Sequence, residues 1–130
     1  MNNIIKLSTI NLLLISVFSL YGNVQEIHSS EEFNNIIKSH NTVVVKFYNS
    51  GCKFCHDEQA QSLVRGIVNS FPGVPIIGIN TDEDEVDNRL IKQHYKINQY
   101  PTYLVIKNER EISRILGNNY YGIDGALRSQ

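Results

Sequence analysis

The chain has no tryptophan, a single methionine and only two cysteines among its 130 residues. It also has no cluster of lysine and arginine, and its formal net charge is −1. A chain without a basic patch gives no reason to expect binding to nucleic acid or to an anionic membrane surface. Two cysteines and four scattered histidines do not supply the two closely spaced ligand pairs of a structural zinc site.

The two cysteines lie close together, in the segment Cys52-Lys53-Phe54-Cys55. They follow a β-branched run, Thr42–Tyr48, and a short turn, and an apolar-periodic segment comes next. This order predicts a strand, a turn and a helix that begins at Cys52. Cys-x-x-Cys at such a junction is typical of a redox dithiol, because the free N–H groups and positive dipole of a helix N-terminus stabilise a thiolate. A bridge across two residues closes a very small loop, so it gains little as a structural staple.

The first 22 residues differ from the rest of the chain. Lys6 is their only charged residue, and a mainly apolar run follows it. This pattern is typical of a secretory signal, and we expect cleavage between Ser19 and Asn23. The run is shorter than the roughly 18–20 apolar residues of a membrane-spanning helix. An uncleaved anchor is the alternative, and only then do we expect membrane attachment.

Removal of the signal leaves one domain, residues 23–130, in the periplasm, a secretory lumen or the extracellular space. Outside the reducing cytosol a cysteine pair can persist as a disulfide.

The apolar pattern of this domain predicts an α/β fold, with a mixed sheet of four to five strands and helices on both faces. Ser29 and Glu32 fit a capping box at the start of the first helix. In the third helix we expect Val86, Leu90 and Ile91 to face inward. The helices are expected over residues 29–39, 52–71, 81–95 and 123–128, and the strands over residues 42–48, 74–80, 103–107 and 111–116.

Three landmarks give the chain a resemblance to the thioredoxin superfamily over about residues 24–127. The first is the strand, turn and Cys-x-x-Cys of residues 43–55. The second is Tyr95-Lys96-Ile97-Asn98-Gln99-Tyr100-Pro101-Thr102, which looks like the family's Tyr-x-Ile-x-x-aliphatic-Pro-Thr segment. The third is Ile106-Lys107-Asn108 with a strand that ends at Gly117. The resemblance implies a thioredoxin fold and thiol–disulfide oxidoreductase activity without a cofactor.

The resemblance also implies roles for individual residues. Cys52 would be the exposed nucleophile and Cys55 the shielded, resolving cysteine. Pro101 would follow a cis peptide bond beside the dithiol, and Tyr100 would offer its backbone to an extended substrate segment. The expected partners are proteins with disulfides or dithiols and a redox-recycling partner, and we expect a monomer.

The chain departs from the thioredoxin pattern close to the dithiol. Gly51 stands where thioredoxins carry a tryptophan, and Lys53 and Phe54 replace their Gly-Pro dipeptide. Lys46 stands at their buried acid and Gly78 at its partner lysine. The last helix is also truncated. The chain is therefore not a close copy of a cytosolic thioredoxin.

Three cations are candidates for tuning the thiolates: Lys46, Lys53 and His56. Two orientations are open for Lys46 in its apolar strand. Its side chain either extends to the sheet edge or solvent, or it points under the dithiol, where its charge would favour thiolates. We expect His56 either to lie on the helix surface or to act on the dithiol together with Lys53.

Two other functions fit the same cysteines. Cys-x-x-Cys followed by His56 is also the attachment pattern of c-type haem. The second axial ligand would then be His28, His40 or His94, because the only methionine, Met1, would be lost with the signal. The other alternative is a non-catalytic thioredoxin-fold module, with a structural disulfide, that holds a partner protein.

Overall fold

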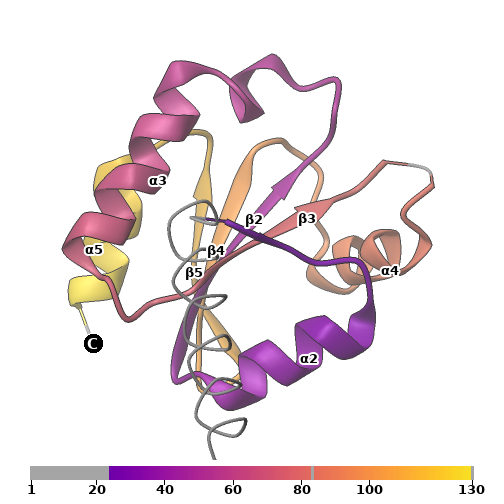
Figure 1. Cartoon of the computed structure of the whole chain (residues 1–130), viewed down its shortest axis with the longest axis horizontal. Coiled ribbons are helices and arrows are strands. Elements are labelled where there is room, and N and C mark those ends of the chain that lie inside the picture. Colours follow the sequence, from indigo (N-terminus) through magenta and orange to yellow (C-terminus); the bar gives the residue numbers. More distant parts are fainter. Residues whose placement is uncertain (1–23, 83, 130) are drawn as a thin grey trace, which may run out of the picture.

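Five strands form one mixed sheet in the order β1-β3-β2-β4-β5 (Figure 1). The first three are parallel, and β4 lies antiparallel to both β2 and β5. The computed structural model describes residues 24–82 and 84–129, so the expected signal segment lies outside the described residues. The strands are β1 (Gln25–Glu26), β2 (Thr42–Tyr48), β3 (Ile76–Asn80), β4 (Thr102–Lys107) and β5 (Arg110–Leu116).

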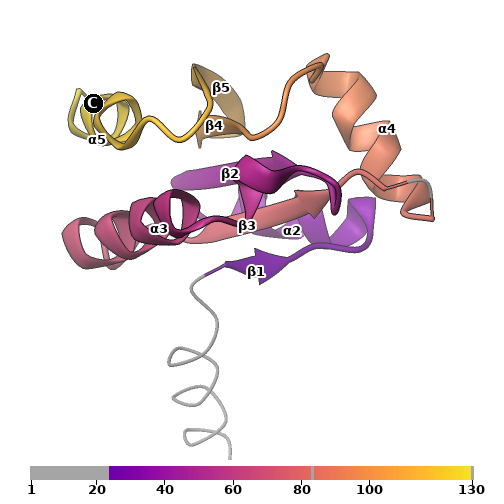
Figure 2. The same cartoon turned by 90° about the horizontal axis from the view of Figure 1, so that it is seen from above.

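In the described part of the chain, four helices cover the two faces of the sheet, and their placement on both faces agrees with the prediction. Figures 1 and 2 show α3 and α5 against one face, and α2 and α4 against the other. A short 3₁₀ turn precedes α3. The helical segments are α2 (Ser30–Ser39), the 3₁₀ turn (Lys53–Cys55), α3 (Glu58–Ser70), α4 (Val86–Tyr95) and α5 (Tyr120–Arg128).

The central strand β2 divides its side chains between the two layers of the core. Val43, Val45 and Phe47 pack in the cluster beneath α2 and α4, whereas Val44 packs in the cluster beneath α3 and α5. Because side chains alternate along a strand, Lys46 points to the same face as Val44. The strand that precedes the dithiol therefore places one cation in the α3 and α5 layer.

Local signals set several of the element boundaries. The Ser29 hydroxyl accepts the Glu32 N–H at 3.1 Å, which confirms the predicted cap of α2. At the β4–β5 hairpin, Asn108 and Glu109 both have positive φ, as in the two-residue turns that match strand twist. β3 begins at Ile76, two residues later than predicted, because Pro75 has no N–H to donate to a neighbouring strand.

The buried face of α4 differs from the prediction. Val86 and Leu90 are 58% and 54% exposed, so the expectation that they face inward is wrong, whereas Ile91 is buried. The reason is Asn88, which is fully buried. Its amide donates to the Ile27 carbonyl at 2.8 Å and to the Asn80 carbonyl at 2.9 Å. This polar anchor turns α4 so that Asn88 and Ile91 form its inner face.

Candidate active site

Cys52 and Cys55 form a disulfide, with their Cα atoms 5.3 Å apart. The two residues differ in exposure, because Cys55 is 1% exposed whereas Cys52 is half-buried. This matches the expectation of an accessible first cysteine and a shielded second one.

The cysteines precede the α-helix, so the prediction of a helix that begins at Cys52 is wrong. The Cys55 N–H pairs with the Cys52 carbonyl at 3.2 Å in the 3₁₀ turn. α3 begins only at Glu58, because the Asp57 carboxylate accepts the Ala60 N–H at 3.0 Å and caps the helix there. The negative charge of Asp57 thus opposes the positive end of the α3 dipole. Because α3 begins after the cysteines, its N-terminus lies farther from the sulfurs than expected.

The sheet brings the second landmark to the same end as the disulfide. Phe47 on β2 pairs with Thr102 on β4, so Pro101 lies level with the last residues of β2. The Tyr100–Pro101 peptide bond is cis, as the resemblance implied. Pro101 is buried and Tyr100 is half-buried, and the Pro101 carbonyl accepts the Gly117 N–H at 2.8 Å. The dithiol turn and the proline segment are therefore neighbours at one edge of the sheet.

Lys46 points under the dithiol. It is 9% exposed, and its Nζ donates to the Cys55 carbonyl oxygen at 2.7 Å. Burial lowers the pKa of Lys46, while the nearby charges of Glu26 and Asp57 act in the opposite direction. Of the two orientations left open by the sequence, the structure thus has the inward one.

The other two cations lie on the outside of the site. Lys53 and His56 are both exposed. His56 Nε2–H donates to the Asn49 carbonyl at 3.1 Å, and the ring packs edge-on against Tyr48 with the centroids 5.5 Å apart. His56 thus folds back over the turn that precedes Cys52.

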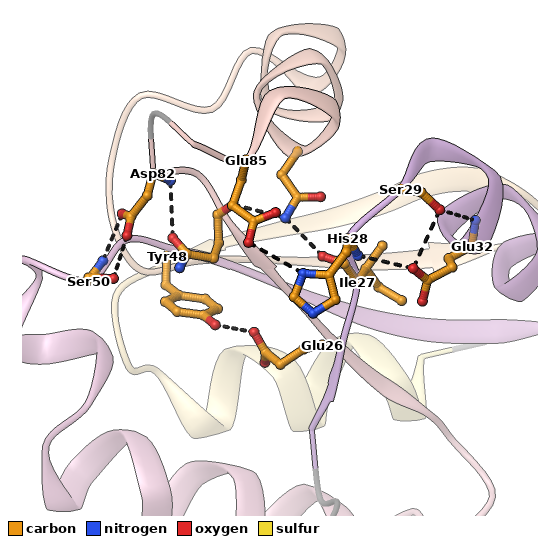
Figure 3. A network of polar contacts seen from close by, with 11 residues as sticks. Glu26, Ile27, His28, Ser29, Glu32, Tyr48, Ser50, Asp82 and Glu85 are labelled. Carbon is orange, nitrogen blue, oxygen red and sulfur yellow. Dashed lines mark hydrogen bonds and ion pairs between the residues drawn. The ribbon is translucent and has the colours of Figure 1, made fainter.

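Two polar anchors of the dithiol turn were not found from the sequence. Asp82 accepts hydrogen bonds from the N–H of Ser50, at 3.0 Å, and from its hydroxyl (Figure 3). These bonds lower the pKa of the Asp82 carboxyl. On the opposite side, Asn118 donates to the Phe54 carbonyl at 2.7 Å and accepts the Tyr103 hydroxyl at 3.0 Å. Neither residue belongs to a motif, so only the fold brings them to the cysteines.

The structure gives no support to the haem alternative. The two sulfurs that a haem would require are joined to each other. His28 lies beside Glu85, His40 beside its own helix end, and His94 against Tyr95. Within residues 24–82 and 84–129, no three histidine, cysteine or acidic side chains gather as a possible metal site.

The thioredoxin family model matches residues 24–127. The chain belongs to the thioredoxin family. This thioredoxin-family chain is 23% identical over 110 residues to thioredoxin-3, mitochondrial, of Saccharomyces cerevisiae. The aligned region covers 85% of this chain and 82% of the relative. It is 25% identical over 104 residues to thioredoxin-1 of the same yeast, which covers 80% and 95% of the two chains.

Solved thioredoxin structures share the fold of this family member. The oxidised form of yeast mitochondrial thioredoxin 3 matches with a TM-score of 0.72 at 20% identity, covering 85% of this chain and 98% of that one. Oxidised thioredoxin from Plasmodium falciparum matches with a TM-score of 0.66 at 23% identity, covering 80% and 94%. The predicted thioredoxin fold is confirmed, and with the cysteine pair the family places this protein among the thiol–disulfide oxidoreductases.

Proposed function

We propose that this thioredoxin-family oxidoreductase exchanges its Cys52–Cys55 disulfide with disulfides or dithiols of proteins outside the cytosol. The observation that carries the proposal is the asymmetric disulfide, with Cys52 half-exposed and Cys55 buried. In such a pair, the sulfur of Cys52 is accessible to a partner, whereas the shielded sulfur of Cys55 can resolve the mixed disulfide. Export is supported by the charge and apolar pattern of residues 1–22. None of the described helices is long and apolar enough to cross a membrane.

The proposed reaction has two exchange steps. In the first, the Cys52 thiolate attacks one sulfur of a substrate disulfide, and the other substrate sulfur leaves as a thiolate and takes up a proton. In the second, the Cys55 thiolate attacks Cys52, and the bond from Cys52 to the substrate breaks. The substrate leaves as a dithiol and the Cys52–Cys55 disulfide is formed, so two electrons pass from enzyme to substrate. The reverse sequence oxidises a substrate dithiol, and the reduction potentials set the direction.

Tyr100 and Pro101 are the proposed substrate-binding residues. They lie where β4 starts, at the edge of the sheet that carries the disulfide. A substrate segment in an extended conformation would pair with the backbone of Tyr100, and these main-chain hydrogen bonds would supply affinity that does not depend on the substrate's sequence.

Insulin reduction by dithiothreitol tests the catalytic proposal. The wild-type chain is expected to accelerate the precipitation of reduced insulin, and Cys52→Ser is expected to remove that acceleration. Cys55→Ala is expected to accumulate mixed disulfides with partner proteins in cells, because no thiol remains to resolve them. A wild-type rate equal to that of dithiothreitol alone would favour the non-catalytic binding module.

A second experiment tests export. The chain is expressed with its own N-terminus in a host with a secretory pathway, and the N-terminal residue of the exported protein is determined. We expect a start between Ser19 and Asn23. A full-length chain in the cytosol would refute export, whereas a full-length chain in the membrane fraction would show a retained anchor.

A further inference from the structure

Three neighbouring strands form a row of positions beneath Cys55. Glu26 on β1 pairs with Gly78 on β3, and Gly78 pairs with Lys46 on β2. Paired residues of adjacent strands point to the same face of a sheet. An acidic and a basic side chain therefore share the α3 face, and only a glycine stands between them.

Gly78 leaves room for the Glu26 side chain to fold over β3, the strand between β1 and β2. A Cβ atom at Gly78 would clash with Glu26 Oε2. The Glu26 carboxylate also accepts the hydroxyl of Tyr48, as Figure 3 shows. Lys46 Nζ in turn lies 5.5 Å from the centre of the Tyr48 ring. Carboxylate, phenol and ammonium are thus one contiguous group.

The ammonium end of this group touches the second cysteine. Lys46 Nζ is bound to the Cys55 carbonyl, and the sulfur of the same residue is only three bonds from that carbonyl carbon. A cleft opens beside Lys46 and Cys55, and its lining is part apolar (Val24, Ala60 and Val64) and part polar (His56, Gln61 and Arg65). Charges interact more strongly in partly apolar surroundings than in water, so the ammonium acts on the ionisation of this thiol.

Other polar groups face the Lys46 side chain and Cys55. Asp57 caps α3, and its charge also acts on Lys46 in the same direction as that of Glu26. Arg65 pairs with Glu58 at 2.6 Å. The His56 ring bonds to the loop before Cys52, and the Tyr103 hydroxyl bonds to Asn118. Burial raises the pKa values of both Tyr48 and Tyr103, so both phenols remain neutral donors at neutral pH.

We propose that Lys46 and Glu26 are positioning residues for the resolving step, in which Lys46 stabilises the Cys55 thiolate and Glu26 opposes that effect. The proposal rests on the proposed function, because it assumes that Cys55 resolves the mixed disulfide. Cys55 releases its proton to solvent through the cleft, and its thiolate then attacks Cys52. The attack forms the intramolecular disulfide and expels the substrate sulfur as a thiolate. Lys46 and Glu26 stand at the two ends of the row and carry opposite charges. Lys46 therefore makes the Cys55 thiol more acidic, and Glu26 makes it less acidic.

The test is a pH titration of Cys55 in the Cys52→Ser chain, where Cys55 is the only thiol. The ultraviolet absorbance of the thiolate is the readout. Lys46→Met is expected to make the thiol about tenfold less acidic, since one pKa unit is a tenfold change in the ionisation constant. Glu26→Gln is expected to make it more acidic by a smaller factor, because this exposed carboxylate is screened by solvent. The matched controls on exposed positions of α2, Lys38→Met and Glu31→Gln, should leave the titration unchanged.

Shifts of the same sign in both variants, or no shift in Lys46→Met, would overturn the proposal. Should Lys46→Met fail to fold, as judged by circular dichroism, Lys46→Gln takes its place, and Lys46→Arg is expected to retain the wild-type titration. The titration needs no substrate. Its failure is therefore distinct from a failure of the proposed activity, which insulin reduction by the wild-type chain tests separately.

Discussion

At the scale of single residues, the two sulfurs of one disulfide have different surroundings. Cys55 is buried and lines the cleft together with Ala60 and Val64, whereas Cys52 is half-buried at the start of the 3₁₀ turn. Accessibility and thiolate character together decide which thiol reacts first. The ammonium of Lys46 favours ionisation of the buried thiol, but an alkylating reagent reaches Cys52 more readily.

We therefore expect limiting iodoacetamide to label Cys52 first in the reduced protein. Peptide mass spectrometry after short exposure measures the two sites separately. The fully unfolded protein, in which both thiols are accessible, is the control. Preferential labelling of Cys55 in the folded protein would reverse the proposed roles.

A second residue-scale prediction concerns Asn88. Replacement by alanine removes the donor that satisfies two carbonyl groups, Ile27 and Asn80. We expect Asn88→Ala to lower the free energy of unfolding by about 2–4 kcal/mol, since buried carbonyls without a partner are costly. Urea denaturation measures the change, and Asn34→Ala on the exposed face of α2 is the control. A loss below 1 kcal/mol, on the order of an ordinary exposed substitution, would mean that other groups take over these carbonyls.

At the scale of elements, the dithiol turn is held by segments from three parts of the chain. Lys46 on β2 binds it from below, Asp82 binds it from the loop after β3, and Asn118 binds it from the loop after β5. Of the three residues of the 3₁₀ turn, only Cys55 is buried, because Lys53 and Phe54 are exposed. Three polar contacts thus hold the turn in addition to the burial of Cys55, and each of them can be removed separately.

The Asp82 anchor should make this stabilisation dependent on pH. Hydrogen bonds from Ser50 lower the pKa of Asp82 in the folded protein. The contribution is therefore fully present above the pKa of an unfolded aspartate, about 3.9, and is lost as pH falls through the lower folded value. We expect Asp82→Asn to lower the melting temperature at pH 7, with the difference from wild type vanishing in acid below both pKa values.

Thermal unfolding across pH measures this difference. The double variant with Ser50→Ala serves as the control, because it should be no less stable than Asp82→Asn alone if the two residues act only on each other. A difference from wild type that stays constant down to low pH would contradict the assignment.

The elements that sequence reasoning found are those with strong local signals. β2 was predicted over its full length from its apolar run, and α2 from its capping box. The start of α3 was missed because Asp57 caps the helix after the cysteines, in competition with a start at Cys52. β1 was missed because two residues are too few to show alternation.

The site was predicted in part for the same reason. Cys52, Cys55 and Pro101 belong to motifs, and Lys46 was singled out as a charge in an apolar strand. Glu26, Asp82 and Asn118 act through tertiary contacts only, so no local pattern marks them. The burial of Asn88 was likewise hidden, since a polar residue on a helix is normally expected at the surface.

At the scale of the whole molecule, the disulfide lies at one edge of the sheet, to which four strands contribute an end. The ends of β2, β3 and β5 and the start of β4 all lie at this edge. Three cations lie close to the pair in sequence or in space: Lys46 on β2, Lys53 in the 3₁₀ turn and His56 at its end. Among these charges, Lys46 is buried, so solvent screens it less than the exposed Lys53 and His56.

We expect a reduction potential above the roughly −270 mV of thioredoxin and toward the roughly −180 mV of protein disulfide isomerase. A cation that stabilises a thiolate favours the reduced form, and about 30 mV corresponds to about 1.4 kcal/mol in this couple. Equilibration with glutathione measures the potential. Lys46→Met is expected to lower it, and Lys38→Met should not change it. A wild-type value at or below −270 mV would instead make the protein a reductant.

Gly78 on β3 also connects the redox site with the proposed cleavage of the signal segment. Through Gly78, the acidic partner comes from β1, which lies just after the proposed cleavage region, and Val24 lines the cleft itself. If cleavage occurs there, it creates an α-ammonium group a few residues from Glu26. Trimming by a few more residues would delete β1 and its carboxylate. Proteolytic processing would then set the acidity of Cys55, so chains with ragged amino termini should separate into species with different thiol reactivity.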